Sequence, residues 1–126
     1  MLIAAAEVGG TLAVMQLHGR QSEVGTVPVL ALSGSVDLST VPTLCDALAR
    51  LIGDHAGRLV AVDLDGVDVL DDSGLGVLLG AAGRARSNGG ELVIVASDGR
   101  LRDRFAITGL DRAVDVVERL AAALTR

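Results

Sequence analysis

Hydrophobic positions along the chain alternate between short runs rich in valine and leucine and longer stretches with helical spacing. The short runs predict strands over 11–17, 27–33, 58–64, 91–96 and 113–116. Leucine and alanine at spacings of three and four predict helices from 39 or 40 to about 52, from 73 to about 86, from 97 or 98 to 108, and over 117–124. Polar, glycine-bearing segments between these elements, such as 18–26, are expected to be loops.

The order of these elements, β-β-α-β-α-β-α-β-α, predicts the fold class. Strands that alternate with helices through short connections form a mostly parallel central sheet covered by helices, here about four of them. The first strand is joined to the second by a short loop, so we expect it at the edge, antiparallel, as a hairpin. No repeat or low-complexity tract divides the chain. We therefore expect a single α/β domain over 11–126, preceded by a loose segment 1–10.

The helical spacing also predicts which side chains face the sheet. In the first helix these are Leu44, Leu48, Leu51 and Ile52; in the second they are Leu75, Leu78, Leu79 and Ala82. Cys45 lies among the leucines of the first helix and is expected to be buried. It is the only cysteine and has no intrachain disulfide partner, which favours a cytoplasmic protein.

Composition narrows the classes of partner. Half of the 126 residues are hydrophobic, yet Phe105 is the only aromatic residue, so the chain has no aromatic platform on which nucleobases could stack. Sixteen acidic residues against eleven arginines and no lysine give a net charge of −5. An acidic surface repels nucleic acid and anionic membranes and favours a basic protein partner. The first residues lack the basic and long apolar regions of a signal peptide, and no apolar run reaches membrane-spanning length, so we expect neither a signal peptide nor a membrane span.

One candidate for chemistry is the aspartate pair in Asp63-Leu64-Asp65-Gly66, which follows a hydrophobic run. It resembles the opening motif of haloacid-dehalogenase-type phosphatases, in which Asp63 would attack phosphorus and Asp65 would handle the leaving-group proton. Such an enzyme also needs a cationic clamp and further carboxylates for magnesium. The chain has no lysine, and Asp98 is the one acidic residue at the next strand end. The preferred interpretation makes Asp63 and Asp65 turn formers.

A second candidate is Ser73, at the point where the pattern changes from extended to helical. Its hydroxyl suits a helix N-cap, which contributes about 1 kcal/mol. Gly76, Gly80 and Gly83 then each weaken the helix by about 1 kcal/mol relative to alanine. We expect that these glycines are tolerated because they let the helix lie close to the sheet or to a partner protein.

Three blocks in this chain resemble the STAS domains of anti-sigma factor antagonists. They are LSGSVDLSTVPTL (32–44), LVAVDLDGVDVLDDSGLGVLLGAAGRAR (59–86) and GGELVIVASDGRLRDRFAITGLDRAVDV (89–116). The resemblance implies a protein without catalysis of its own that binds a serine-kinase-type anti-sigma factor and thereby frees a sigma factor. Phosphorylation of Ser73 by that kinase would end binding, and a serine phosphatase would restore it.

The same resemblance implies the residues of the partner site. Asp37 matches an acidic residue close to the acceptor, and the remaining positions around Ser73 are Asp71, Asp72, Gly74, Leu75 and Gly76. Asp37 also suits a cap of the first helix. Many family members carry a small hydroxyl residue where this chain has Asp72. That difference bears on whether Ser73 is regulated and has less bearing on the fold. A monomer or weak dimer is expected.

Other interpretations follow from the same residues. STAS modules also serve as subunits of anion transporters and lipid-exporting ABC systems, so a free transporter subunit is the alternative. The arginines at 100, 102 and 104 favour a solvated helix face over an anion site. His18 and His55 lack further ligands at metal spacing, and a phosphate-binding loop of the Gly-x-x-x-x-Gly-Lys type is impossible without lysine. We therefore expect no metal and no cofactor.

Overall fold

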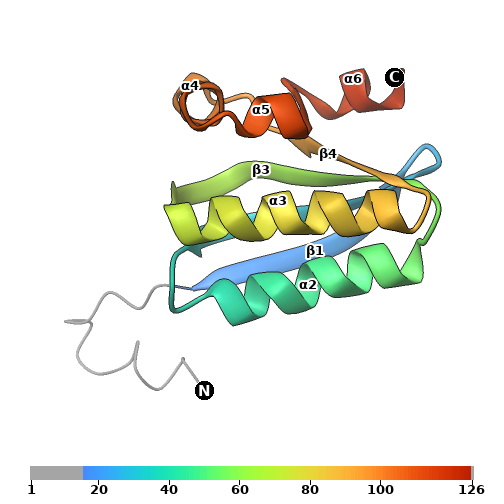
Figure 1. Cartoon of the computed structure of the whole chain (residues 1–126), viewed down its shortest axis with the longest axis horizontal. Coiled ribbons are helices and arrows are strands. Elements are labelled where there is room, and N and C mark those ends of the chain that lie inside the picture. The colour runs from blue at the N-terminus through green and yellow to red at the C-terminus, as the bar shows by residue number, and fades with distance from the viewer. Residues whose placement is uncertain (1–15, 126) are drawn as a thin grey trace.

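Five strands form one sheet in the order in which they occur in the sequence (Figure 1). The structure is a computed structural model and describes residues 16–125. β1 pairs antiparallel with β2, and every later pairing is parallel, as predicted. The strands are β1 (Leu17–Val24), β2 (Val27–Val36), β3 (Leu59–Leu70), β4 (Glu91–Val95) and β5 (Asp115–Val117).

Helices cover both sides of this sheet. α2 (Val41–Asp54) and α3 (Asp72–Ser87) lie side by side on one face, while α6 (Leu120–Leu124) contacts β3, β4 and β5 on the other (Figure 1). α4 (Gly99–Thr108) and α5 (Leu110–Ala113) follow β4. The described residues thus hold five helices where about four were predicted, because Gly109, with φ 80°, ends α4 and a separate turn of helix follows. β5 and α6 begin two and three residues later than predicted.

Two hydrophobic clusters hold these layers together. Because both faces of β2, β3 and β4 carry apolar side chains, alternate residues enter opposite clusters. The larger cluster lies against α2 and α3 and includes Phe105, which is fully buried. The smaller cluster lies under α6 and consists of Val27, Val29, Ala61, Val93, Val95 and Ala123.

The N-terminal hairpin differs from its prediction. Residues 18–24 form most of β1, so their assignment to a loop was wrong, whereas positions 1–15, which include most of the predicted first strand and the segment 1–10, lie outside the described residues. Residues 18–23 are all exposed, as on an edge strand, and therefore show no hydrophobic alternation. The two-residue turn Gly25-Thr26, with Gly25 at φ 61°, sets the pairing.

β3 also runs further than predicted. It continues through Gly66 to Leu70, so the turn expected at Asp63 to Gly66 is wrong. The pairing with β2 shifts register between Ala31 and Ser33, and Gly66 lies at this irregularity. A Cβ at Gly66 would lie 2.8 Å from the Leu32 carbonyl oxygen, so glycine permits the close approach of the two strands.

The inward faces of the helices are largely as predicted. All four predicted α2 residues are buried, as are Leu75, Leu78 and Ala82 on α3. Leu79 is 45% exposed, so its prediction was wrong. Cys45 is likewise exposed rather than buried. Each of the two follows a buried leucine, and one residue turns a helix by about 100°, which carries the side chain out of the apolar stripe.

No helix among residues 16–125 combines the length and the apolar character that crossing a membrane requires.

Candidate functional site

The site begins where the parallel strands β2 and β3 end. Their register pairs Val36 with Leu70, and the Asp71 N–H donates to the Val36 carbonyl oxygen over 3.0 Å. Asp37 and Asp71 each follow one residue of that pair and therefore leave the sheet at the same edge. α3 starts at this edge, so the structure brings the predicted residues Asp37 and Ser73 to one end of the sheet.

The start of α3 is capped by Asp71, not by Ser73. Asp71 has extended backbone angles, and its Oδ1 accepts hydrogen bonds from the Ser73 N–H at 3.1 Å and the Gly74 N–H at 3.3 Å. Ser73 is the second residue of the helix, so its predicted role as N-cap is wrong. A carboxylate two residues earlier already accepts from the free amides, which leaves the serine hydroxyl available for a different contact.

That contact is a short hydrogen bond from Ser73 Oγ to Asp71 Oδ1, at 2.5 Å. It is the largest influence on the pKa of Asp71. Together with the Gly74 and Ser73 amides and the charge of Arg104, it outweighs desolvation and holds the pKa of Asp71 below its ordinary value. Asp71 is therefore ionised at neutral pH. The Ser73 hydroxyl is half-buried and uses its proton for this bond, which leaves its oxygen lone pairs free to accept a group.

Asp37 shapes the turn that leads into α2. Its Oδ1 accepts from the Ser39 N–H at 2.9 Å, the Ser39 hydroxyl at 2.6 Å and the Thr40 N–H at 3.2 Å. The N-cap position itself is Thr40, which makes no side-chain capping bond, so Asp37 is not the cap that the sequence suggested. Leu38, between them, is 77% exposed. The turn therefore presents an apolar side chain beside a fixed carboxylate.

The residues after Ser73 divide between core and surface. Gly74 is buried, and a Cβ there would lie 2.4 Å from Val36 Cγ1 and 2.8 Å from Leu70 Cδ1. Leu75 is 7% exposed and belongs to the larger core cluster. Gly76 is exposed and has no atom within 4 Å of such a Cβ. Close packing against the sheet thus accounts for Gly74 at the helix start.

The glycines further along α3 have no such explanation within the described chain. A Cβ at Gly76, Gly80 or Gly83 would meet nothing within 4 Å, so the predicted close approach of these residues to the sheet is wrong. The other predicted explanation, close approach to a partner protein, remains for these three glycines.

Asp72 makes an ion pair that sequence reasoning missed. Its Oδ1 lies 2.7 Å from Nη2 of Arg104 on α4, and the Asp72 side chain is 92% exposed. The three arginines of the 100–104 cluster have different partners, since Arg100 lies near Asp98 and Arg102 near Glu118. The cluster is therefore not one solvated face. Nothing in the sequence links Asp72 to a residue 32 positions later.

Apolar side chains gather beside this helix start. A shallow groove of about 150 Å³ lies between α3 and the α4–α5 turn, and two exposed apolar residues, Leu79 on α3 and Ile107 near the end of α4, lie on the helices that flank it. The groove is lined by Leu75, Gly76, Leu79, Thr108, Gly109, Leu110 and Ala113. Exposed apolar groups near fixed charges are typical of protein-binding surfaces.

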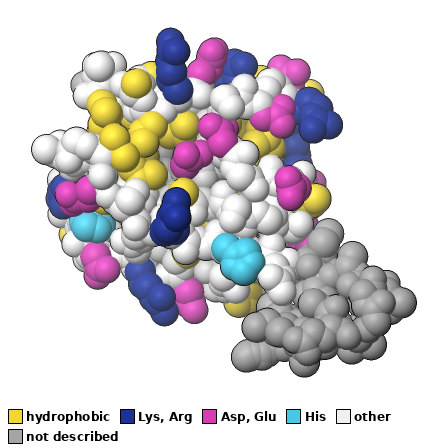
Figure 2. Space-filling model, turned by 180° about the vertical axis from the view of Figure 1, so that it is seen from behind, with side chains coloured by type: hydrophobic (Ala, Val, Ile, Leu, Met, Phe, Trp, Pro, Cys, Tyr) yellow, Lys and Arg dark blue, Asp and Glu magenta, His cyan; other side chains and the backbone are white. Residues whose placement is uncertain are grey.

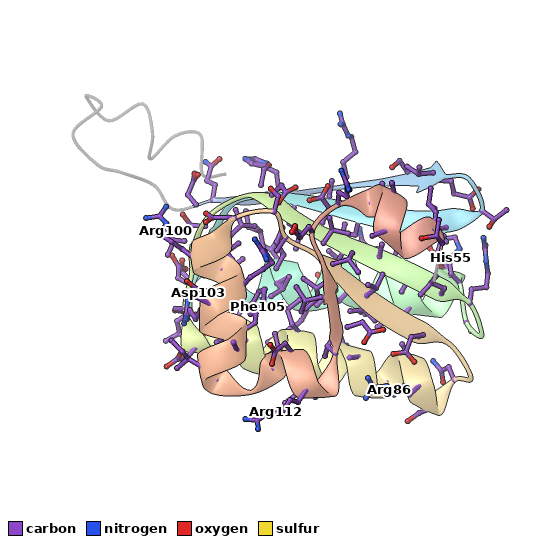
Figure 3. All side chains as sticks on the ribbon, turned by 90° about the horizontal axis from the view of Figure 1, so that it is seen from above. His55, Arg86, Arg100, Asp103, Phe105 and Arg112 are labelled. Carbon is purple, nitrogen blue, oxygen red and sulfur yellow. The ribbon has the colours of Figure 1, made fainter. Side chains whose placement is uncertain are left out.

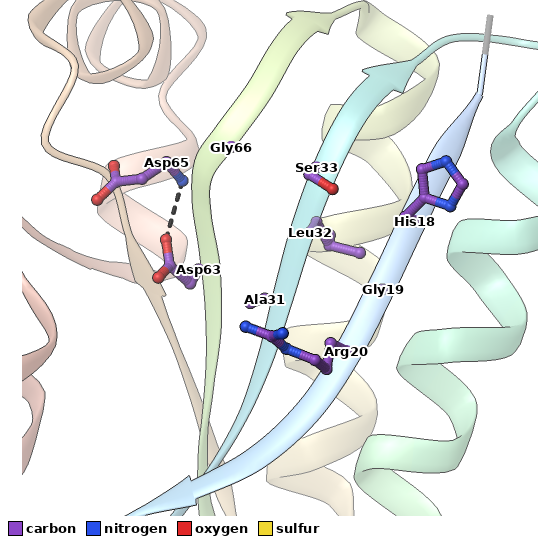
Figure 4. A pocket seen from close by; sticks show the side chains of 9 residues that line it. All are labelled: His18, Gly19, Arg20, Ala31, Leu32, Ser33, Asp63, Asp65 and Gly66. Atoms are coloured by element: carbon purple, nitrogen blue, oxygen red, sulfur yellow. Dashed lines mark hydrogen bonds between the residues drawn. The ribbon is translucent and has the colours of Figure 1, made fainter.

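Asp63 and Asp65 lie elsewhere, on the sheet face opposite α2 and α3 (Figure 4). Asp63 Oδ1 accepts from the Asp65 N–H at 2.9 Å, and Asp65 Oδ1 accepts from the Ser97 N–H at 2.7 Å. The pair therefore fixes the β3 irregularity and ties it to the end of β4.

A depression of about 420 Å³ lies in front of these aspartates. Seen from this side, apolar side chains gather toward one end of the molecule, and mixed polar and charged ones cover the middle (Figure 2). Arg20 is the cation of the depression, and His18 lies at its rim (Figure 4). The Ser73 site is separate, because none of its residues lines this depression.

Comparison with known proteins agrees with this architecture. The family model of the STAS domain matches residues 21–123. An anti-sigma-B factor antagonist from Listeria monocytogenes is 33% identical over 84 residues, which cover 67% of this chain and 73% of the relative.

Two solved structures show the same fold. An anti-sigma factor antagonist from Mycobacterium paratuberculosis superposes with a TM-score of 0.73 at 25% identity, over 87% of this chain and 92% of that one. The Bacillus cell fate determinant SpoIIAA in its phosphorylated form gives 0.62 at 20% identity, over 86% of this chain and 100% of that one, a likeness of fold. With the mixed sheet and the matched residues together, the chain belongs to the STAS domain family.

Proposed function

We propose that this STAS protein is a cytoplasmic anti-sigma factor antagonist whose partner is an anti-sigma factor with serine kinase activity, and that phosphorylation of Ser73 ends the complex. The names of the Listeria and Mycobacterium relatives support the partner class. The observation that carries the proposal is Ser73 itself: a half-buried hydroxyl in the first turn of α3, beside Asp71 and Asp72, on a helix whose next residues line an exposed apolar groove.

The phosphorylation step needs little from this chain. Ser73 Oγ attacks the γ-phosphorus of ATP held by the kinase; the new O–P bond forms as the bond to ADP breaks. The hydroxyl proton leaves along its hydrogen bond to the Asp71 carboxylate and passes from there to solvent. Phosphoryl transfer depends mainly on positioning and charge stabilisation, so a fixed serine oxygen is the contribution expected from the substrate protein.

Charge explains why modification would end binding. A phosphate adds about −1.5 to −2 charge next to the ionised Asp71 and the exposed Asp72. A partner surface that fits a neutral hydroxyl would then face a desolvated dianion. A loss of about 3 kcal/mol in binding free energy weakens the complex more than a hundredfold.

The test is binding to a kinase-type anti-sigma factor with ADP or ATP present, followed by mapping of the phosphate. Wild-type protein should bind with ADP and be released with ATP. Ser73→Ala should bind and resist release, whereas Ser73→Glu should bind more than a hundredfold more weakly. The control is Ser87→Ala, which removes an exposed hydroxyl from the other end of α3 and should behave as wild type.

Two outcomes would contradict the proposal. Phosphate mapped to a residue other than Ser73 would move the switch elsewhere. Failure to bind any such kinase, together with capture of a transporter ATPase, would assign the protein to the transporter-associated branch of STAS modules.

A further inference from the structure

Arg104 is the cation that the fold brings to the start of α3. Its Nη2 lies 2.7 Å from Oδ1 of Asp72, the residue directly before Ser73. Its charge also contributes to the lowered pKa of Asp71, whose carboxylate accepts the Ser73 hydrogen bond. The guanidinium therefore acts on Asp72, which precedes the serine, and on Asp71, which accepts its hydrogen bond.

The packing of α4 holds Arg104 in this position. Phe105 points from α4 into the core, whereas Arg100 and Asp103 point away from it (Figure 3). The Arg104 side chain is 32% exposed, compared with 93% for Arg100. Arg104 therefore extends from α4 to the start of α3, with its charged end at the surface.

We propose that Arg104 is the counter-charge of phosphorylated Ser73, and that its guanidinium exchanges Asp72 for the phosphate when the serine is modified. This inference rests on the proposed function. The exchange is feasible because an ion pair with a carboxylate that is 92% exposed contributes little free energy. A phosphate carries up to twice the charge and three acceptor oxygens, so it is the stronger partner for a guanidinium.

The exchange changes how Asp72 acts. In the unmodified protein Arg104 neutralises Asp72, so this extra acidic residue does not imitate phosphorylation. After modification Arg104 pairs with the phosphate, and Asp72 adds its own uncompensated charge to the surface. Arg104 therefore offsets one acidic charge in either state, while modification itself adds about −1.5 to −2 charge to the site.

The experiment measures the second pKa of phosphoserine at position 73 by ³¹P NMR, with phosphoserine incorporated by genetic encoding in the full chain. The charged groups around this site are Asp37, Asp71, Asp72 and Arg104, together with Asp68, Asp98 and Arg100, which line a depression with Arg104. Arg104→Gln should raise that pKa by roughly 0.5–1 unit, less than the shift of a buried pair because the site is exposed. Arg104→Lys should retain part of the effect.

The matched control is Arg84→Gln, which removes the same charge from an exposed position on α3. It lies eleven residues from Ser73, or about 16 Å along the helix, beyond the Debye length in physiological salt. An equal pKa in wild type and Arg104→Gln, or an equal shift in Arg84→Gln, would overturn the inference. Because the phosphoserine is encoded, failure of a kinase to modify Ser73 would contradict the proposed function and leave this result intact.

Discussion

At the scale of single residues, Asp71 organises the start of α3. One carboxylate oxygen accepts from two backbone amides and from the Ser73 hydroxyl, so helix geometry and the position of the candidate phosphoacceptor depend on the same side chain. Removing it should therefore affect stability and phosphorylation together, which distinguishes Asp71 from a residue that only caps a helix.

This dependence predicts an acid-sensitive contribution to stability. The folded-state pKa of Asp71 lies below the ordinary value of an aspartate, so its contribution to stability is present above that ordinary pKa and is lost as the pH falls through the folded value. Urea unfolding at pH values from 6 to 2.5 should show wild type losing more stability below pH 4 than Asp71→Asn loses. The variant should already have a lower urea midpoint at pH 6. Parallel curves for the two proteins would contradict the assignment.

Gly74 and Gly76 form a matched pair for a second prediction. A methyl group at Gly74 would meet Val36 and Leu70 at 2.4 and 2.8 Å, whereas one at Gly76 would meet nothing within 4 Å. Gly74→Ala should lower the free energy of unfolding by about 1–3 kcal/mol through overpacking. Gly76→Ala should raise it by up to about 1 kcal/mol through helix propensity. Urea denaturation measures both, and equal effects of the two changes would exclude close packing as the reason for Gly74.

At the scale of elements, α3 has one face that the described fold leaves free. Gly80→Ala with Gly83→Ala should raise the free energy of unfolding by roughly 1–2 kcal/mol, because alanine favours a helix and finds no obstacle here. A stabilised double variant that binds the anti-sigma factor more weakly would show that a partner needs these glycines. Unchanged binding would place the partner on other residues.

The positions of helices and strands were predictable from the sequence wherever buried apolar side chains determine them. β4 and the buried face of α2 follow directly from runs and spacings of leucine and valine. The antiparallel first strand was predicted but its residues were misplaced, because an exposed edge strand is specified by its turn and its neighbour. The end of β3 was misplaced because Asp63, Asp65 and Gly66 are typical of turns, and only the pairing with β2 shows that glycine serves a close approach between strands.

The candidate site divides in the same way. Ser73 was located from the change of pattern and the family resemblance. The residue that caps α3 was not, because Asp71 and Ser73 both suit an N-cap and only the hydrogen-bond geometry decides between them. The pair of Asp72 and Arg104 depends on where the fold places α4 relative to the start of α3, and no local sequence pattern contains that information. Long-range charge pairs therefore required the structure.

At the scale of the whole molecule, the proposed switch separates stability from binding. The phosphate would sit at the N-terminus of α3, where the helix dipole favours an anion by about 0.3–1 kcal/mol and partly offsets repulsion from Asp71 and Asp72.

We expect encoded phosphoserine at 73 to leave the circular dichroism spectrum unchanged and to move the free energy of unfolding by no more than about 1 kcal/mol. Binding to the anti-sigma factor, measured by calorimetry, should fall more than a hundredfold. A change of several kcal/mol in the free energy of unfolding would instead mean that loss of binding follows from damage to α3. Phosphorylation would then act by unfolding the helix and not by altering the charge of an intact surface.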